Sequence, residues 1–168
     1  MKNIAQFEKV SYKQFKEDIS KYSFLSDKNI KELYDNIKLP KRATVGSAGY
    51  DFFNPMFDFY LAPGDSITIP TGIRCNIDQE WVLFIVPRSG LGFKYSVRLN
   101  NTVGIIDSDY FFSDNEGHIF IRITNGGNKS CEIKADTAFA QGIFLQYGTT
   151  VDDDTQGIRN GGFGSTSK

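Results

Sequence analysis

The hydrophobic and polar positions of the first 42 residues predict one strand and two helices. Residues 3–10 alternate weakly between apolar and polar side chains, which predicts a strand. Ser11 is followed three positions later by Gln14, the spacing of a capping box, and this predicts a short helix to about Lys21. A second helix is predicted behind Asp27 as its N-cap and is ended by Pro40, because apolar residues recur there at helical spacing: Ile30, Leu33, Tyr34 and Ile37.

From Ala43 onward the pattern changes to short apolar runs rich in aromatic and β-branched residues. Four of these runs predict strands, at residues 66–69, 81–86, 119–123 and 138–140. Residues that favour turns separate them, at 63–65, 70–72, 113–115 and 125–128. Many short strands at near-regular spacing favour an all-β fold, either a sandwich or a jelly roll.

Length and composition predict one soluble, globular domain with an appended terminal piece. The chain has 168 residues, of which 40% are hydrophobic and 23% charged, and its net charge is −1. Residues 1–42 carry ten Lys or Arg against six acids, but these charges are spaced along the segment, so we interpret them as a solvated face. No stretch is apolar enough to span a bilayer, so we expect no membrane partner. Because the net charge is close to zero, we also expect no nucleic-acid partner.

The cysteines and the histidine restrict the kinds of catalytic and metal sites that the chain can form. Cys75 and Cys131 lie in apolar runs without metal-ligand spacing, which favours buried free thiols and a reducing cytoplasm. His118 is the only histidine, so a Ser-His-Asp triad or a multi-histidine metal site is hard to build. We therefore expect carboxylates, hydroxyls and arginines to carry the chemistry.

The most informative stretch is residues 101–110, where an apolar run leads into two acids and an aromatic residue. The run contains Gly104 and Ile106, and the residues after it are Asp107, Asp109 and Tyr110. Apolar residues followed directly by carboxylates predict a buried strand that ends at a turn. Such a turn can hold a carboxylate at the edge of a pocket.

Three other segments carry polar groups suited to a ligand, although each is a weak signal alone. Residues 46–51 place small residues beside Tyr50 and Asp51 and can equally be a glycine turn into a strand. Residues 87–92 follow an apolar strand with an arginine, a hydroxyl and flexible glycines, which can bind phosphate oxygens. Gln141 lies within an apolar strand and is either a satisfied core amide or a ligand contact.

The tail of residues 151–168 combines glycines with a cation, one aromatic ring and two hydroxyls. Its composition alone is typical of a disordered terminus. Phe163 can stack on a base, which is worth roughly 1–3 kcal/mol, and Ser165, Thr166 and Arg159 can contact phosphate oxygens. This combination favours a flexible arm that wraps a nucleotide.

These five segments, in this order, resemble the five motifs of the homotrimeric dUTP diphosphatases (dUTPases). The resemblance runs from about residue 38 to residue 167, some three quarters of the chain. It implies a jelly-roll fold, a distorted β-barrel, over residues 43–150, with residues 1–42 as a strand and helical extension and 151–168 as the arm with the fifth motif. It also implies a cytoplasmic homotrimer, in a bacterium or a phage-infected host, with active sites between subunits.

The resemblance implies hydrolysis of dUTP to dUMP and pyrophosphate, which limits uracil in DNA and supplies dUMP for thymidylate synthesis. Asp107 matches the acid that activates the water attacking the α-phosphorus, and Tyr110 the ring that excludes a ribose hydroxyl. Asn101 matches the reader of the uracil edge, together with the neighbouring backbone at Gly104 and Ile106. The phosphate-site and arm positions are matched by Arg88, Ser89, Gly90, Gln141, Arg159, Phe163, Gly164, Ser165 and Thr166. Mg²⁺ is expected to be held by the triphosphate and water, with Asp51 at most in its outer sphere.

The chain also departs from the family pattern. Residues 111–113 and a polar loop to Gly117 stand where a basic residue and a glycine are frequent, and Tyr95 stands where a histidine is frequent. Arg159 lies four residues before Phe163 rather than three or five. The helices of residues 11–39 are extra relative to the compact form, and we expect them to cap the barrel or to pack between subunits.

Two other functions remain as alternatives. A dCTP deaminase on the same scaffold would need a glutamate for water activation, and Glu116 is the only one near the third motif. A trimeric module that binds a regulator would retain partner binding without Asp107.

Overall fold

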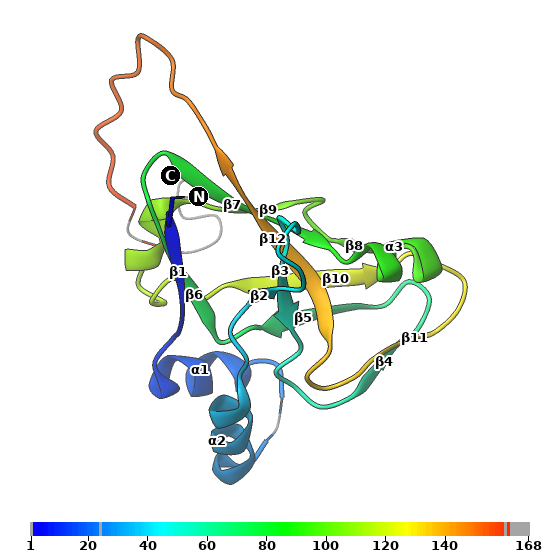
Figure 1. Cartoon of the computed structure of the whole chain (residues 1–168). Helices are drawn as coiled ribbons and strands as arrows, with labels where there is room; N and C mark the ends of the chain where they lie inside the picture. The colour runs from blue at the N-terminus through cyan, green and yellow to red at the C-terminus, as the bar shows by residue number, and fades with distance from the viewer. Residues whose placement is uncertain (1, 24, 160, 162–168) are drawn as a thin grey trace.

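The computed structural model describes residues 2–23, 25–159 and 161. Within them the chain is mostly β-structure arranged as a jelly-roll-like fold (Figure 1), as the spacing of the strands predicts. The helices are α1 (Tyr12–Ile19), α2 (Asp27–Asn36), α3 (Ser89–Tyr95) and the 3-10 helix η1 (Ser108–Phe112). The strands are β1 (Ala5–Lys9), β2 (Lys41–Arg42), β3 (Tyr50–Phe53), β4 (Phe59–Leu61), β5 (Ser66–Pro70), β6 (Ile73–Ile77), β7 (Trp81–Pro87), β8 (Val97–Leu99), β9 (Gly104–Ile106), β10 (Phe120–Asn125), β11 (Cys131–Ile133) and β12 (Ala138–Gln146).

The strands form four hydrogen-bonded sheets, and all their described pairings are antiparallel. The largest has the order β2-β3-β12-β7-β9, and a second has the order β5-β10-β8. The remaining sheets are the pairs β1-β6 and β11-β4. The described sheets do not close into one continuous barrel; side chains from their inner faces meet in one core.

The N-terminal segment is part of this core. β1 pairs along its whole length with β6, and Phe15, Ile19 and Ile30 of the two helices are almost fully buried. Both helices lie together beside one end of the β-sheets (Figure 1). Burial of apolar side chains from α1 and α2 thus holds the extension against the sheets.

The predicted helices form, but their ends differ from the prediction. Ser11 caps α1 by accepting a 3.1 Å hydrogen bond from the amide of Gln14, whereas the Gln14 side chain donates to Asp18 instead of returning to Ser11. The N-cap of α2 is Ser26 and not Asp27, which is its first residue. α2 ends at Asn36, before Pro40 could interrupt it, because the chain turns to ψ 124° at Ile37.

Both cysteines are buried free thiols, as predicted. Burial raises the pKa of the Cys131 thiol and, more strongly, that of Cys75, so both stay protonated and act as small apolar residues. Among the described residues, no helix is long and apolar enough to cross a membrane.

Candidate active site

Asp107 stands where a buried strand ends, as the sequence predicts. β9 alternates between core and surface, and Asp107 follows with extended dihedrals (φ −78°, ψ 159°) as the N-cap of η1. Its carbonyl accepts a 3.2 Å hydrogen bond from the amide of Tyr110, while its side chain is 45% exposed. The short 3-10 helix thus begins at an accessible carboxylate and carries a buried aromatic ring three residues later.

Tyr110 is fixed at its hydroxyl. The side chain is only 3% exposed, and the hydroxyl donates a 2.7 Å hydrogen bond to the carbonyl of His118. It also accepts a 2.9 Å hydrogen bond from Nδ2 of Asn115. Burial raises the pKa of Tyr110, so the phenol remains a donor at neutral pH and the ring keeps one orientation.

Arg159 of the arm returns to this turn and bridges its two acids. Nη2 lies 2.6 Å from Oδ2 of Asp107, and Nε lies 3.0 Å from Oδ1 of Asp109. The guanidinium carbon is 5.7 Å from the ring centre of Tyr110, within reach of a cation–π contact. Asp109, for which the sequence predicts no catalytic role, is therefore the second partner of Arg159.

The loop of residues 113–118 supports the turn from below. Gly117 has φ +71°, and a Cβ there would lie 2.7 Å from Cα of Phe111, so only glycine lets the loop pack this closely. The hydroxyl of Ser113 lies 3.4 Å from the carbonyl of Gly161, which adds a second contact between this region and the arm.

A second group of predicted residues forms around the ends of β3, β7 and β12. Nε of Arg88 lies 3.3 Å from Oδ1 of Asp51, and Asp51 is the cross-strand neighbour of Gln141. Gly49 leaves space for this group, because a Cβ there would lie 2.4 Å from Oε1 of Gln141. The structure thus brings the first, second and fourth motifs together.

The flexible glycines of residues 87–92 indicated a loop, but the structure places Ser89 and Gly90 in a helix. They begin the helix α3, with Arg88 as its N-cap, and neither Gly90 nor Gly92 has a positive φ. Two glycines in seven residues conceal a helix from propensity, because glycine disfavours helical backbone. The phosphate-site prediction therefore falls on the first turn of a helix.

Asn101 lies in the turn that joins β8 to β9, two strands of different sheets. The turn is tight: Thr102 has φ +68°, and the carbonyl of Asn101 accepts a 2.7 Å hydrogen bond from the amide of Val103. Further along, Gly104 and Ile106 are buried, so only their backbone groups are available to a ligand. Four other predicted binding residues, Phe163, Gly164, Ser165 and Thr166, lie outside the described residues.

The two groups of site residues lie at opposite ends of β7. Ile106 pairs with Leu83, so Asp107 lies alongside the start of β7, whereas Arg88 follows its last residue. Arg88 lies six positions after Val82, a distance of about 20 Å in an extended strand. Within one chain the groups are too far apart to share one small site.

Asp107 and Asp109 offer oxygen donors of the kind that a magnesium ion prefers. Mg²⁺ commonly keeps several waters and binds through substrate phosphates, so the two carboxylates would meet it through its water shell. Among residues 2–23, 25–159 and 161, no three His, Cys, Asp or Glu side chains gather in one cluster.

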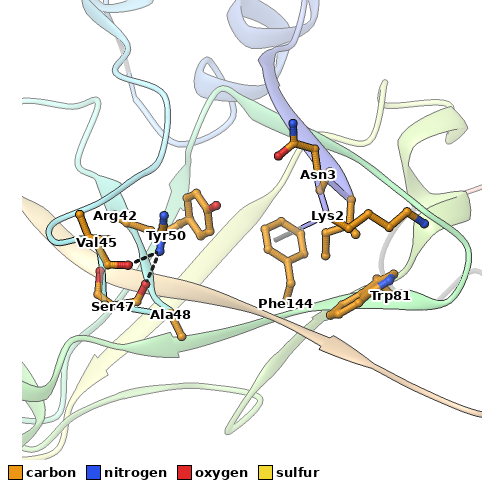
Figure 2. A pocket seen from close by; sticks show the side chains of 12 residues that line it. Lys2, Asn3, Arg42, Val45, Ser47, Ala48, Tyr50, Trp81 and Phe144 are labelled. Atoms are coloured by element: carbon orange, nitrogen blue, oxygen red, sulfur yellow. Dashed lines mark hydrogen bonds between the residues drawn. The ribbon is translucent and has the colours of Figure 1, made fainter.

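A separate cavity of about 560 Å³ lies between the first strand and the loop before β3 (Figure 2). Trp81 and Phe144 line one side, and the guanidinium of Arg42 donates 2.9 and 3.0 Å hydrogen bonds to the carbonyls of Val45 and Ser47 on the other. Asp107 does not line it, so this cavity and the candidate catalytic carboxylate are distinct.

Comparison with known proteins decides the family. A family model described as dUTPase matches residues 35–167, most of the chain. The chain belongs to the dUTPase family. It is 38% identical over 133 residues to the deoxyuridine 5'-triphosphate nucleotidohydrolase of Lactococcus lactis, covering 77% of this chain and 88% of that protein. The protein of the same name from Shigella sonnei is 39% identical over 137 residues, covering 77% and 87%.

Solved structures agree with this membership of the dUTPase family. A dUTPase from Streptococcus mutans superposes with a TM-score of 0.61 at 28% identity, covering 86% of this chain and 97% of that one. The dUTPase of Staphylococcus bacteriophage 80alpha with dUPNHPP has a TM-score of 0.65 at 18% identity, covering 95% and 92%, which supports the fold alone.

The sequence does not predict the contact that joins the N-terminal extension to this dUTPase site. His118 is fully buried, and its Nδ1 lies 2.6 Å from Oδ2 of Asp18 in α1. One signal was available: Asp18 lies between Phe15 and Ile19 on the apolar stripe of an amphipathic helix. A charged residue at such a position indicates a buried partner.

Proposed function

We propose that this chain hydrolyses dUTP to dUMP and pyrophosphate in a Mg²⁺-dependent reaction. The observation that carries the proposal is that Arg159 contacts both the exposed carboxylate of Asp107 at the start of η1 and the buried ring of Tyr110 within it. The acid can hold the attacking water, and the aromatic ring can pack against the sugar of the same nucleotide. The names of the relatives support dUTP as the substrate.

Asp107 orients the nucleophilic water and accepts its proton. The water oxygen forms a bond to the α-phosphorus, the bond to the bridging oxygen breaks, and pyrophosphate leaves with the bonding electrons. An ionised aspartate can act as this general base when it is within hydrogen-bonding reach of the water. Bound Mg²⁺ supplies charge neutralisation to the triphosphate, with the carboxylates at most meeting its water shell.

Arg159 holds the site ready for a polyphosphate. Its guanidinium bridges Asp107 and Asp109, and it is the kind of group that binds phosphate oxygens in bidentate fashion. A nucleoside triphosphate therefore competes with the two carboxylates for Arg159. Transfer of the guanidinium to phosphate frees Asp107 for its water and draws the arm over the nucleotide.

Base and sugar selection belong to the turn between β8 and β9 and to Tyr110. Asn101 and the backbone of this tight turn offer donors and acceptors to the uracil edge. A site built from such groups rejects the wrong base by about 10⁴-fold, because mispaired groups stay unsatisfied. The fixed Tyr110 ring supplies the steric barrier to ribose that a bare apolar pocket, with discrimination of only about 10²-fold, lacks.

The complete site forms between subunits of a homotrimer. Asp107 and the Asp51–Arg88 pair lie about 20 Å apart along β7, so one nucleotide meets both only when they come from different copies. Sharing a site between copies requires a fixed assembly. The distance between the two groups along β7 therefore supports a trimer whose sites are shared between subunits.

The outer face of the largest sheet provides the surface for that assembly. Trp81, Leu83 and Ile85 of β7 pack toward the core, so the alternate residues face outward. Val82 and Phe84 have apolar cross-strand neighbours, of which Ile105 and Leu145 remain 53% and 45% exposed, whereas Val86 pairs with Gln141. A contiguous apolar sheet face is typical of a subunit interface; its incompletely buried members here are Phe84, Val86, Ile105, Ile143 and Leu145.

The contacts of Glu116 argue against the deaminase alternative. Its two carboxylate oxygens accept 2.7 Å hydrogen bonds from the amide and the hydroxyl of Ser11. Burial alone would raise the pKa of Glu116, but these hydrogen bonds outweigh it and lower the pKa. A glutamate committed to a helix N-cap is poorly placed to move protons at a pyrimidine ring.

Pyrophosphate release from dUTP, dCTP, dTTP and UTP, measured with Mg²⁺, tests the proposal directly. We expect rapid release from dUTP and little from the other three. Ammonia released from dCTP without pyrophosphate from dUTP would identify a deaminase instead. Tight binding of a protein partner with negligible turnover of any nucleotide would identify a binding module.

A further inference from the structure

We propose that the N-terminal helix α1 sets the sugar selectivity of the site, with Asp18 and His118 acting as positioning residues for Tyr110. The inference rests on the proposed function, because it takes Tyr110 as the barrier to ribose. The family-model match begins at residue 35, so Asp18 and all of α1 lie before the matched region. The contribution therefore comes from a segment that the family model does not include.

The first link is a buried carboxylate–imidazole pair. Asp18 is 2% exposed and His118 is 0% exposed, and Oδ2 lies 2.6 Å from Nδ1. Nε2 of His118 accepts a 2.8 Å hydrogen bond from the amide of Gly72. Because Nε2 is an acceptor, the ring proton lies on Nδ1 and is donated to Asp18. Both ring nitrogens are thus used, and the imidazole can adopt only one orientation.

The second link joins the backbone of His118 to Tyr110. The carbonyl of His118 accepts the 2.7 Å hydrogen bond from the Tyr110 hydroxyl. Asn115, three residues earlier in the same loop, donates to that hydroxyl as well. Since the imidazole and the carbonyl belong to one residue, a shift of the ring shifts the acceptor that orients the phenol.

The polar pair is not needed to keep α1 in place. Phe15 and Ile19 flank Asp18 on the same helix and are fully buried, so apolar contact already docks the helix. Burial would raise the pKa of Asp18, but hydrogen bonds from His118, Gln14 and Lys21 outweigh this and lower it to about 2. A buried carboxylate held by hydrogen bonds is weak evidence of added stability, but it can specify a single geometry.

The loop that carries this link is held at two further points. Ser11, the N-cap of α1, binds Glu116 through its amide and its hydroxyl. Ser113 at the start of the loop contacts the carbonyl of Gly161 in the arm. The loop of residues 113–118 therefore lies between the N-terminal helix on one side and the arm on the other, and supports Tyr110 between them.

The test compares the kcat/KM for dUTP with that for UTP in Asp18→Ala and in the unmodified protein. We expect the dUTP-to-UTP ratio to fall by about 10-fold, because a small misplacement of a positioning group has effects of that order or larger. Asp18→Asn keeps an oxygen acceptor for Nδ1 of His118 and should restore most of the ratio. Asp35→Asn, an exposed change of the same charge on α2, is the matched control and should leave the ratio unchanged.

A double-mutant cycle shows whether the effect passes through Tyr110. Tyr110→Phe removes the hydroxyl that the His118 carbonyl orients. Asp18→Ala should then have little further effect on the dUTP-to-UTP ratio. Additive effects of the two changes would overturn the route through the phenol. An unchanged ratio in Asp18→Ala, with a lowered melting temperature, would make Asp18 purely structural.

Two measures keep the outcomes distinguishable. If Asp18→Ala does not fold, the double change Asp18→Leu with His118→Phe removes both partners while filling their space, and the same fall in ratio is expected. Absence of pyrophosphate release from dUTP by the unmodified protein would refute the proposed function. A protein that discriminates dUTP from UTP equally well with and without Asp18 would refute only this inference.

Discussion

Nη2 of Arg159 lies 2.6 Å from Oδ2 of Asp107, and these two residues are 52 positions apart in the chain. The contact brings the arm to one of the two exposed carboxylates of the third motif. Asp109 holds the other side of the same guanidinium. Ion pairs therefore join the arm to the turn. A bound triphosphate must replace the two carboxylates as the partner of Arg159.

Asp107→Asn should abolish hydrolysis while dUTP still binds. The amide has nearly the same volume, but it cannot accept a proton from water, so we expect turnover to fall by about 10³-fold or more. Pyrophosphate release and calorimetric titration with dUTP measure the two properties separately.

Asp109→Asn is the matched control, since Asp109 shares Arg159 but has no role with the water. Its kcat should stay within about 10-fold of the unmodified protein. Loss of nucleotide binding in Asp107→Asn would show instead that the residue is structural.

Truncation after Gly157 should remove most turnover and leave the fold intact. The deletion removes Arg159 and the predicted stacking ring at Phe163, whereas β12 and the core end earlier, at Gln146. We expect circular dichroism and the oligomeric mass to be unchanged. An unchanged kcat in the truncated chain would refute the role of the arm.

Arg159→Ala separates the cation from the rest of the arm. It should lower kcat/KM by about 10- to 10³-fold, the range found when a charged donor to a reacting phosphate or oxyanion is removed. Arg98→Ala, an exposed arginine on β8, is the control and should have little effect.

Ile105→Lys should break the trimer. The side chain is 53% exposed on the outer apolar face of the largest sheet, and a lysine buried there would leave an unpaired charge at the interface. Light scattering should find monomers, and turnover should fall because the two halves of each site separate. Tyr60→Lys changes another exposed apolar residue, 70% exposed on β4, and should remain trimeric.

Asp18 should make stability depend on acid. Its pKa is lowered in the folded chain from the ordinary 3.8 to about 2, so its contribution is complete above about pH 4 and is lost as the pH falls through 2. The shift corresponds to about 2 kcal/mol of the free energy of unfolding.

Denaturant unfolding of the unmodified protein and of Asp18→Asn measures this term. The difference in their free energies of unfolding should shrink by about 2 kcal/mol between pH 5 and pH 2, because only aspartate titrates in that range. A difference that does not vary with pH would show that Asp18 has an ordinary pKa in the folded chain.

Local features of the fold could be predicted where the deciding interactions are local. The pairing of Ser11 with Gln14 specified the start of α1, and the run from Trp81 to Val86 specified β7. α3 escaped prediction because Gly90 and Gly92 disfavour a helix and only tertiary context makes one there. The N-cap of α2 was misplaced by one residue, since Ser26 and Asp27 are equally suited to cap.

By itself the sequence determined the strand-rich fold and the order of the five motifs, and through the family resemblance it predicted Asp107 and Tyr110 as the key acid and ring. These follow from short-range patterns, in which residue type and spacing carry the information. The tertiary structure alone decided that Asp18 pairs with His118, that Arg159 bridges Asp107 and Asp109, and that the two groups of site residues lie at opposite ends of β7. Contacts between residues 50 to 100 positions apart depend on how the sheets and helices pack, and no local pattern encodes that packing.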